Sequence, residues 1–282
     1  MKANKYLLPL ALAFASLVPT YFVTSSGAQQ VAQPAPEIAV AEYQVGAVLY
    51  MQKAAEYRAL AYQAFNLAKM NLDADFGKRN TKKLPKAERK MPRAVVVDVD
   101  ETVLDNSPAQ AAQIKNNLPF VQSNWTNWVN MRKARAIPGA VDFLNYAASK
   151  GVRVFYVTNR NEAEKQATID NLKSVGFPDV SAETVVVRAA ESGKEARRQA
   201  IAQKYRIVLL IGDNLNDLSN VFERKSVADR FAEVDKARQM FGAKFIVLPN
   251  AMYGDWESAI YEYQRLTEPQ KAEKRAAALE LP

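Results

Sequence analysis

Asp98, Asp100 and Glu101 follow a run of three valines at residues 95–97. β-Branched residues favour an extended, buried chain, so this run predicts a core strand that ends in carboxylates. Desolvated carboxylates repel one another and need a cation, a proton or hydrogen bonds to compensate them. The stretch is therefore either a strand that runs into a solvated acidic turn or a site that uses its negative charge.

The composition limits the chemistry that such a site can use. The 282 residues include no histidine and no cysteine. Without them this chain cannot build a Ser-His-Asp triad, a cysteine nucleophile, a phosphohistidine or a histidine-rich zinc site. A P-loop is excluded too, because Arg188 stands where the motif ending in Gly193-Lys194 needs its first glycine. Chemistry with oxygen ligands and oxygen nucleophiles remains.

The elements that must position the acids form an alternating pattern. Four more short, β-branched apolar runs follow the first strand: 152–160, 183–188, 206–214 and 243–249. Helical stretches separate most of them, and such alternation is typical of a parallel sheet covered by helices on both faces. We therefore predict an α/β fold with a Rossmann-like parallel sheet, in which ligands bind at the carboxyl ends of the strands.

Polar residues gather at those predicted strand ends. Beyond Asp98 and Asp100 they are Thr158, Asn159 and Arg160, then Asp213 and Asn214 with Asp217 a turn later, and Lys194 at the start of a helix. Each alone has an ordinary explanation as a helix cap, a turn or a surface lysine. Together on one edge they indicate a site, and carboxylates without histidine suit a hard cation, Mg²⁺ before Zn²⁺.

The order of these motifs resembles the haloacid dehalogenase superfamily: D-x-D-E-T after a strand, then a threonine, a lysine and G-D-x-x-x-D. Six segments are similar to class C acid phosphatases, in particular the lipoprotein e (P4) type of bacterial 5′-nucleotidase: DVDETVLDNSP, WTNWVNMR, AIPGAVDFLNY, VFYVTNR, IGDNLNDL and LPNAMYGDWE. The similarity runs from about Glu42 almost to the C-terminus. The lipoprotein relatives attach lipid to a cysteine, which this chain lacks, so no lipid anchor is expected.

The resemblance implies a role for each acid. Asp98 would attack phosphorus and form an aspartyl-phosphate, and Asp100 would act as general acid and then general base. Mg²⁺ would be held by Asp98, the backbone carbonyl of Asp100, and Asp213. Asp217 would lie outside the direct ligands and orient water or Lys194.

The same resemblance assigns the phosphoryl oxygens to Thr158, Asn159 and Lys194. It also implies that Trp125 and Tyr253 clamp a nucleoside, which favours nucleoside 5′-monophosphates and nicotinamide mononucleotide as substrates. From the residues alone, Trp125 could equally be core packing, and Trp128 is more simply core packing. Trp125 lies in a stretch of about thirty residues, 105–137, that we expect to form a small cap inserted early in the fold.

The N-terminus resembles a secretory signal. Lys2 and Lys5 precede an apolar stretch over residues 6–23, and small residues follow at 26–28. We expect residues 1–28 to be a cleaved signal peptide and residues 29–41 a flexible mature start, which predicts a periplasmic or secreted protein. The alternative is an uncleaved membrane anchor, because the stretch is almost long enough to span a bilayer.

The rest of the chain divides into an N-terminal helical segment at 42–90, a phosphatase core at 91–270 and a tail at 271–282. The formal charge is +8, but the basic residues are scattered. They therefore indicate an anionic small substrate rather than nucleic acid, and the relatives suggest a homodimer. Two other functions remain open at this point: a broad-specificity phosphatase or phosphotransferase, and a catalytically inactive surface binding protein.

Overall fold

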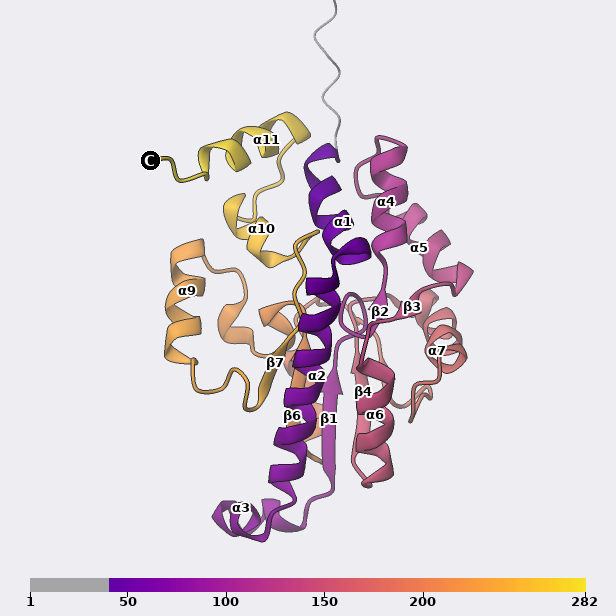
Figure 1. The fold of residues 1–282 in the computed structure, drawn as a ribbon, viewed down its shortest axis with the longest axis vertical. Coiled ribbons are helices and arrows are strands. Elements are labelled where there is room, and N and C mark those ends of the chain that lie inside the picture. The colour runs from indigo at the N-terminus through magenta and orange to yellow at the C-terminus, as the bar shows by residue number, and fades with distance from the viewer. Residues whose placement is uncertain (1–40) are drawn as a thin grey trace, which may run out of the picture. The chain divides into compact units, whose positions relative to one another are not determined.

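The computed structural model describes residues 41–282, so the predicted signal peptide and almost all of the predicted flexible start lie outside the described residues. Its main sheet has five parallel strands (Figure 1). In spatial order they are β5 (Val185–Val186), β4 (Arg153–Val157), β1 (Arg93–Val97), β6 (Arg206–Gly212) and β7 (Phe245–Val247). Each strand overlaps one of the apolar runs that predicted it.

Helices cover both faces of the sheet. Successive strand residues point to opposite sides, and because they are apolar on both sides, each face must be covered. Val95 and Val97 belong to the larger apolar core, which also holds buried residues of α2 (Ala55–Asp75) and α6 (Ala140–Ser149). Val96 belongs to the core on the other face, where α8 (Glu195–Ala202) and α9 (Val227–Lys236) contribute residues. The predicted α/β fold class is confirmed.

The segment before β1 is helical. It contains α1 (Val45–Lys53), the long α2 and the short α3 (Lys78–Lys83), and Figure 1 shows α2 in front of the sheet, running along β1. Helix α2 presents its alanines at 61, 64 and 68 to the core together with Phe65 and Leu72, all of them buried. Small residues at this spacing let the helix approach the strands closely.

The stretch between β1 and α6 carries the small insertion. A two-stranded antiparallel ribbon, β2 (Leu104–Asp105) with β3 (Arg135–Ala136), closes its base, and α4 (Ser107–Lys115) and α5 (Gln122–Met131) form its body. Trp128 packs against the main core, as predicted. Its Nε1 also donates a 2.8 Å hydrogen bond to the side-chain oxygen of Asn106.

The remaining helices complete the fold. They are α7 (Lys165–Ser174), α10 (Asp255–Ile260), α11 (Glu268–Ala277) and short 3-10 helices at Glu42–Gln44, Glu88–Lys90, Glu162–Glu164, Leu215–Asp217 and Asn220–Phe222. Helix α11 reaches into the stretch 271–282 that the sequence suggests as a tail. None of the helices in residues 41–282 combines the length and the hydropathy needed to cross a bilayer.

Candidate active site

Two neighbouring strands bring the central carboxylates together. Val97 of β1 pairs with Ile211 of β6, so the residues after both strands leave the sheet side by side. Asp98 follows β1, Asp213 follows β6, and Asp217 ends the 3-10 helix behind Asp213. One carboxylate oxygen from each of these three aspartates lies within 4.8 Å of the other two. The predicted convergence of Asp98 and Asp213 is thus present in the fold, and Asp217 lies equally close.

Lys194 is the cation at this cluster. Its ammonium contacts Asp98 and lies 2.7 Å from Asp217, and its side chain is buried. Burial raises the pKa of Asp98, with Asp217 and Asp100 adding to the rise and Lys194 opposing it. Burial, Asp217 and Asp98 raise the pKa of Asp213 well above its ordinary value. Burial acts to lower the pKa of Lys194, but Asp217 and Asp98 outweigh it and raise that pKa. The three carboxylates of the cluster therefore outnumber the one ammonium group, that of Lys194, which pairs with them.

Side-chain hydrogen bonds orient the acids. The Thr102 hydroxyl lies 3.2 Å from Asp98 Oδ2 and 3.2 Å from Asp213 Oδ1, and the Asn250 amide donates to Asp213 Oδ2 at 2.8 Å. The strand end itself requires a glycine, because a Cβ at Gly212 would lie 2.4 Å from the Cβ of Asp217. Any side chain at Gly212 would push Asp217 out of the cluster.

Asp100 is held by Arg160, a strand-end residue for which the sequence indicated no role. Arg160 directs Nη2 at 2.7 Å and Nε at 3.0 Å onto Asp100 Oδ1, and its guanidinium is almost completely buried. Nη1 of Arg160 donates to the Thr168 hydroxyl at 3.0 Å. A planar guanidinium fork fixes a carboxylate in two directions. The sequence feature that could have indicated this role is the position of Arg160, three residues beyond Val157, the end of β4, at the same sheet edge.

Thr158 and Asn159 lie at the same edge but face different surroundings. Thr158 is fully buried, and its hydroxyl lies 3.3 Å from Asp100 Oδ2 and accepts the Arg160 N–H at 3.1 Å. Asn159 is exposed and lines the cavity described below, with its side-chain oxygen accepting from Arg197. Of the predicted phosphoryl ligands, Lys194 and Asn159 reach the cavity, whereas Thr158 contacts the general acid–base candidate.

Glu101 turns away from the other acids. It has a left-handed backbone, φ 60°, and is fully buried. Its carboxylate accepts the Asn106 N–H at 2.7 Å and the Tyr253 hydroxyl. Burial, with Asp100 and Asp213 next in effect, raises the pKa of Glu101 well above its usual range. The conformation is costly for a non-glycine residue, and its effect here is to tie the β1 loop to Tyr253.

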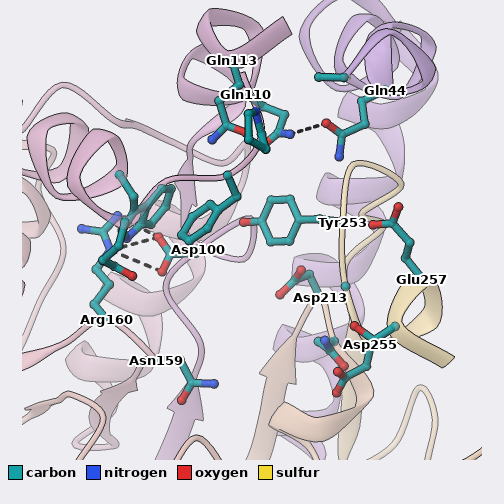
Figure 2. A pocket seen from close by; sticks show the side chains of 18 of the residues that line it. Gln44, Asp100, Gln110, Gln113, Asn159, Arg160, Asp213, Tyr253, Asp255 and Glu257 are labelled. Atoms are coloured by element: carbon teal, nitrogen blue, oxygen red, sulfur yellow. Dashed lines mark hydrogen bonds and ion pairs between the residues drawn. The ribbon is translucent and has the colours of Figure 1, made fainter. Parts of the chain in front are cut away.

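A cavity of about 560 Å³ opens above the acids. Asp98, Asp100, Asp213 and Lys194 reach it, and Trp125 of α5 and Tyr253 after β7 line its walls. Figure 2 shows Tyr253 reaching in from one side and Asp100 with Arg160 on the other. The Arg160 guanidinium lies 5.6 Å from the centre of the Trp125 ring. The volume is in the range of small-molecule sites, and both predicted clamp residues are on its surface.

The donor set fits a hard divalent cation. The three clustered carboxylates offer oxygen only, and their surplus charge is the feature that such an ion would neutralise. Asp98 and Asp213 are two of the predicted ligands, and Asp217, predicted to lie just outside them, has an oxygen within 4.8 Å of both. The described residues contain neither histidine nor cysteine that could favour zinc.

Comparison with known proteins agrees with this geometry. The family model described as HAD superfamily, subfamily IIIB (acid phosphatase) matches residues 21–256. Acid phosphatase 1 of Solanum lycopersicum is 30% identical over 131 residues, which cover 44% of this chain and 51% of that protein. A stem 31 kDa glycoprotein of Glycine max is 30% identical over 129 residues, again 44% and 51%. The chain thus spans about half the length of these plant relatives.

A solved structure covers far more. The class C acid phosphatase from Bacillus anthracis is 40% identical, with a TM-score of 0.80, over 86% of this chain and 99% of that one. A second structure of that enzyme, with tungstate bound, matches equally well. The fold and the family expected from the sequence are confirmed, and the chain belongs to subfamily IIIB of the HAD superfamily, the acid phosphatases, which are phosphoric monoester hydrolases.

Proposed function

We propose that this protein hydrolyses phosphate monoesters with Mg²⁺, through an aspartyl-phosphate on Asp98, and that its substrates are nucleoside 5′-monophosphates and nicotinamide mononucleotide. The observation that carries the proposal is the cluster of Asp98, Asp213 and Asp217 around Lys194 on the floor of an aromatic-walled cavity. An acid surplus in a concave site suits a dianionic phosphate only if a metal ion and a lysine balance the charge.

The chain's own residues supply the covalent steps. An Asp98 oxygen attacks phosphorus, the ester P–O bond breaks, and Asp100 gives a proton to the departing alkoxide. Asp100 then takes a proton from water, which attacks phosphorus, releases inorganic phosphate and restores the Asp98 carboxylate. Lys194 and Asn159 hold phosphoryl oxygens during both displacements. Arg160 keeps the Asp100 carboxylate aimed at the cavity.

Asp98, Asp213 and the backbone carbonyl of Asp100 are the groups that would hold Mg²⁺, and Asp217, which pairs with Lys194, would orient that lysine beside the ion. The bound ion would neutralise the acid surplus and polarise the phosphoryl group. Tungstate in the similar Bacillus anthracis enzyme is a tetrahedral oxyanion like phosphate, which supports an oxyanion site in this fold.

We propose further that the protein acts outside the cytoplasm, in the periplasm or as a secreted, lipid-free protein. The signal-like residues 1–28 support this compartment, and the absence of cysteine supports the lack of a lipid anchor. Intact mass after expression in a bacterium, combined with osmotic-shock fractionation, tests it. A mature start near Gln29 in the soluble periplasmic fraction is expected, whereas a full-length chain in the membrane pellet would support the uncleaved anchor.

A phosphate-release screen over monoesters tests the activity. Nucleoside 5′-monophosphates should be better substrates than glycerol phosphate or sugar phosphates of equal charge. EDTA should abolish release, and Mg²⁺ should restore it. Adding a nucleoside acceptor and analysing products separates hydrolysis from phosphotransfer. Release that is unaffected by EDTA would contradict the metal requirement.

Tyr253→Ala tests the nucleoside clamp. Stacking on an aromatic ring contributes roughly 1–3 kcal/mol per base in nucleic-acid binders, so kcat/KM for nucleotides should fall about tenfold to a hundredfold. An alkyl phosphate, held only at its phosphoryl end, should be nearly unaffected. Tyr253→Phe is the matched control, because it keeps the ring and removes the hydroxyl that contacts Glu101. Equal losses for both substrates would mean that Tyr253 supports the structure of the site instead.

A further inference from the structure

Three glutamines line the cavity wall opposite Asp213 (Figure 2). Gln44 comes from the 3-10 helix before α1, and Gln110 and Gln113 come from α4. In Figure 2 they lie together, and the Tyr253 ring lies between them and Asp213. This wall is therefore where the far end of a substrate would lie if its phosphate sat on the acids and its ring on Tyr253.

Two of the three amides are already engaged by the fold. Gln44 donates to the carbonyl of Met252 at 2.8 Å and accepts from the Gln110 amide. This pair joins the start of the described chain to α4 and to the loop after β7. Its amides hold the cavity wall together and have limited freedom to turn toward a ligand.

The amide of Gln113 is different. The residue is only 8% exposed and lines the cavity, yet within residues 41–282 no hydrogen bond engages its side chain. Its amide nitrogen and oxygen are not fully enclosed by protein, so they are open to the cavity. Since an unsatisfied buried amide is costly, this one is kept paired only by what enters the cavity.

We infer that Gln113 is a specificity residue that reads the edge of the nucleobase. A glutamine amide presents one acceptor and donors side by side, and it pairs with an edge that carries an adjacent donor and acceptor. Nucleobases carry such an edge, whereas sugar and alkyl phosphates end in hydroxyls or methyl groups. The inference rests on the proposed nucleotidase function and adds hydrogen-bond recognition to the sequence-tolerant stacking on Tyr253.

Adenine allows a sharp test, because both of its donor–acceptor edges include the 6-amino group. The assay compares kcat/KM for adenosine 5′-monophosphate, purine riboside 5′-monophosphate, which lacks that amino group, and ribose 5-phosphate. Wild-type enzyme should prefer the adenine nucleotide over the purine one by about 3- to 10-fold, the effect of one hydrogen bond.

Gln113→Met keeps the length of the side chain and removes its hydrogen bonds. It should lower kcat/KM for the adenine nucleotide roughly 5- to 150-fold, bring the adenine-to-purine ratio close to one, and leave ribose 5-phosphate unchanged. Unchanged ribose 5-phosphate turnover also shows that the variant folds. Gln52→Met, at an exposed position of α1, is the matched control and should change nothing.

Two results overturn the inference, and they are distinguishable. If wild type prefers nucleotides over ribose 5-phosphate and Gln113→Met keeps both this preference and the adenine-to-purine ratio, Gln113 does not read the base, while the nucleotidase proposal stands. If wild type does not prefer nucleotides over ribose 5-phosphate, the nucleotidase proposal fails and the role of Gln113 fails with it.

Discussion

Strands β1 and β6 carry a charged cluster at each end. In the cluster at their amino ends, the one carboxylate is fully engaged by two arginines. Asp75, at the end of α2, accepts hydrogen bonds from Arg93 at 2.7 Å and from both terminal nitrogens of Arg206 at 2.6 and 2.7 Å. Arg93 and Arg206 are the first residues of their strands and lie opposite each other. The two guanidinium groups share the one carboxylate of Asp75, and the three side chains remain partly exposed to solvent.

The carboxyl-end cluster is the reverse. Asp98 and Asp217 share the single ammonium of Lys194, and Asp213 lies in the same cluster without an ion pair to it. Folding alone gains little from three converging acids, so the surplus charge indicates ligand and metal chemistry. The same two strands therefore support stability at one end and function at the other, and substitutions at the two ends should separate these properties.

Asp98→Asn should give the largest effect. An amide neither attacks phosphorus nor binds a hard cation well, so kcat should fall by more than about 10⁴-fold. The thermal unfolding midpoint should be retained or raised, because a repulsive charge is removed from the cluster. Phosphate release and differential scanning fluorimetry measure the two properties. A variant that kept wild-type turnover would rule out Asp98 as the nucleophile.

Asp100→Asn should have the next largest effect. Loss of general acid–base help should lower kcat about 10²- to 10⁴-fold. Mg²⁺ affinity, measured by calorimetry, should stay close to wild type, since the proposed metal contact of Asp100 is its backbone carbonyl. The loss should be smaller for an aryl phosphate than for a nucleotide, because an aryl oxide needs less protonation to leave. Equal losses for both esters would argue against the acid role.

Asp75→Asn should show the opposite behaviour. Losing the charged acceptor of two arginines should lower the free energy of unfolding by about 1.5–3 kcal/mol, while kcat stays unchanged. Urea denaturation measures the first and phosphate release the second. Asp73→Asn, in an exposed pair with Lys69 on the same helix, is the matched control and should cost much less. A drop in kcat with Asp75→Asn would mean that the two ends are coupled.

The smallest effect is the pH dependence of that stabilisation. Burial acts to raise the pKa of Asp75, but hydrogen bonds from Arg206 and Arg93 outweigh it and hold the pKa below its ordinary value. A lowered folded-state pKa contributes stability that is complete above the unfolded value of about 4 and is lost as pH falls through the folded value. The stability difference between wild type and Asp75→Asn should therefore shrink below about pH 4. A constant difference there would show that charge is not its source.

The sequence predicted the sheet, and it placed the acids at the ends of its strands, because both depend on local pattern. Apolar runs located the strands, and Asp98 and Asp213 follow from being the first polar side chains after two of them. The partners of Asp100 and Glu101 could not be read in this way. Arg160 is 60 residues from Asp100 and Tyr253 is 152 from Glu101, and only packing of the loops decides such pairs. Nothing in the sequence distinguishes Gln113 from other polar residues, because its burial depends on how α4 packs.

The measurement that tests the central claim most directly is a rapid acid quench of Asp100→Asn during turnover of an aryl phosphate, followed by peptide mass spectrometry. The good leaving group lets the first displacement proceed, and loss of the general base slows the second, so a phosphoryl group should accumulate on the peptide that contains Asp98. The double variant Asp98→Asn/Asp100→Asn should show none. Steady phosphate release with no phosphoryl group on that peptide, or with the group on another residue, would contradict the account.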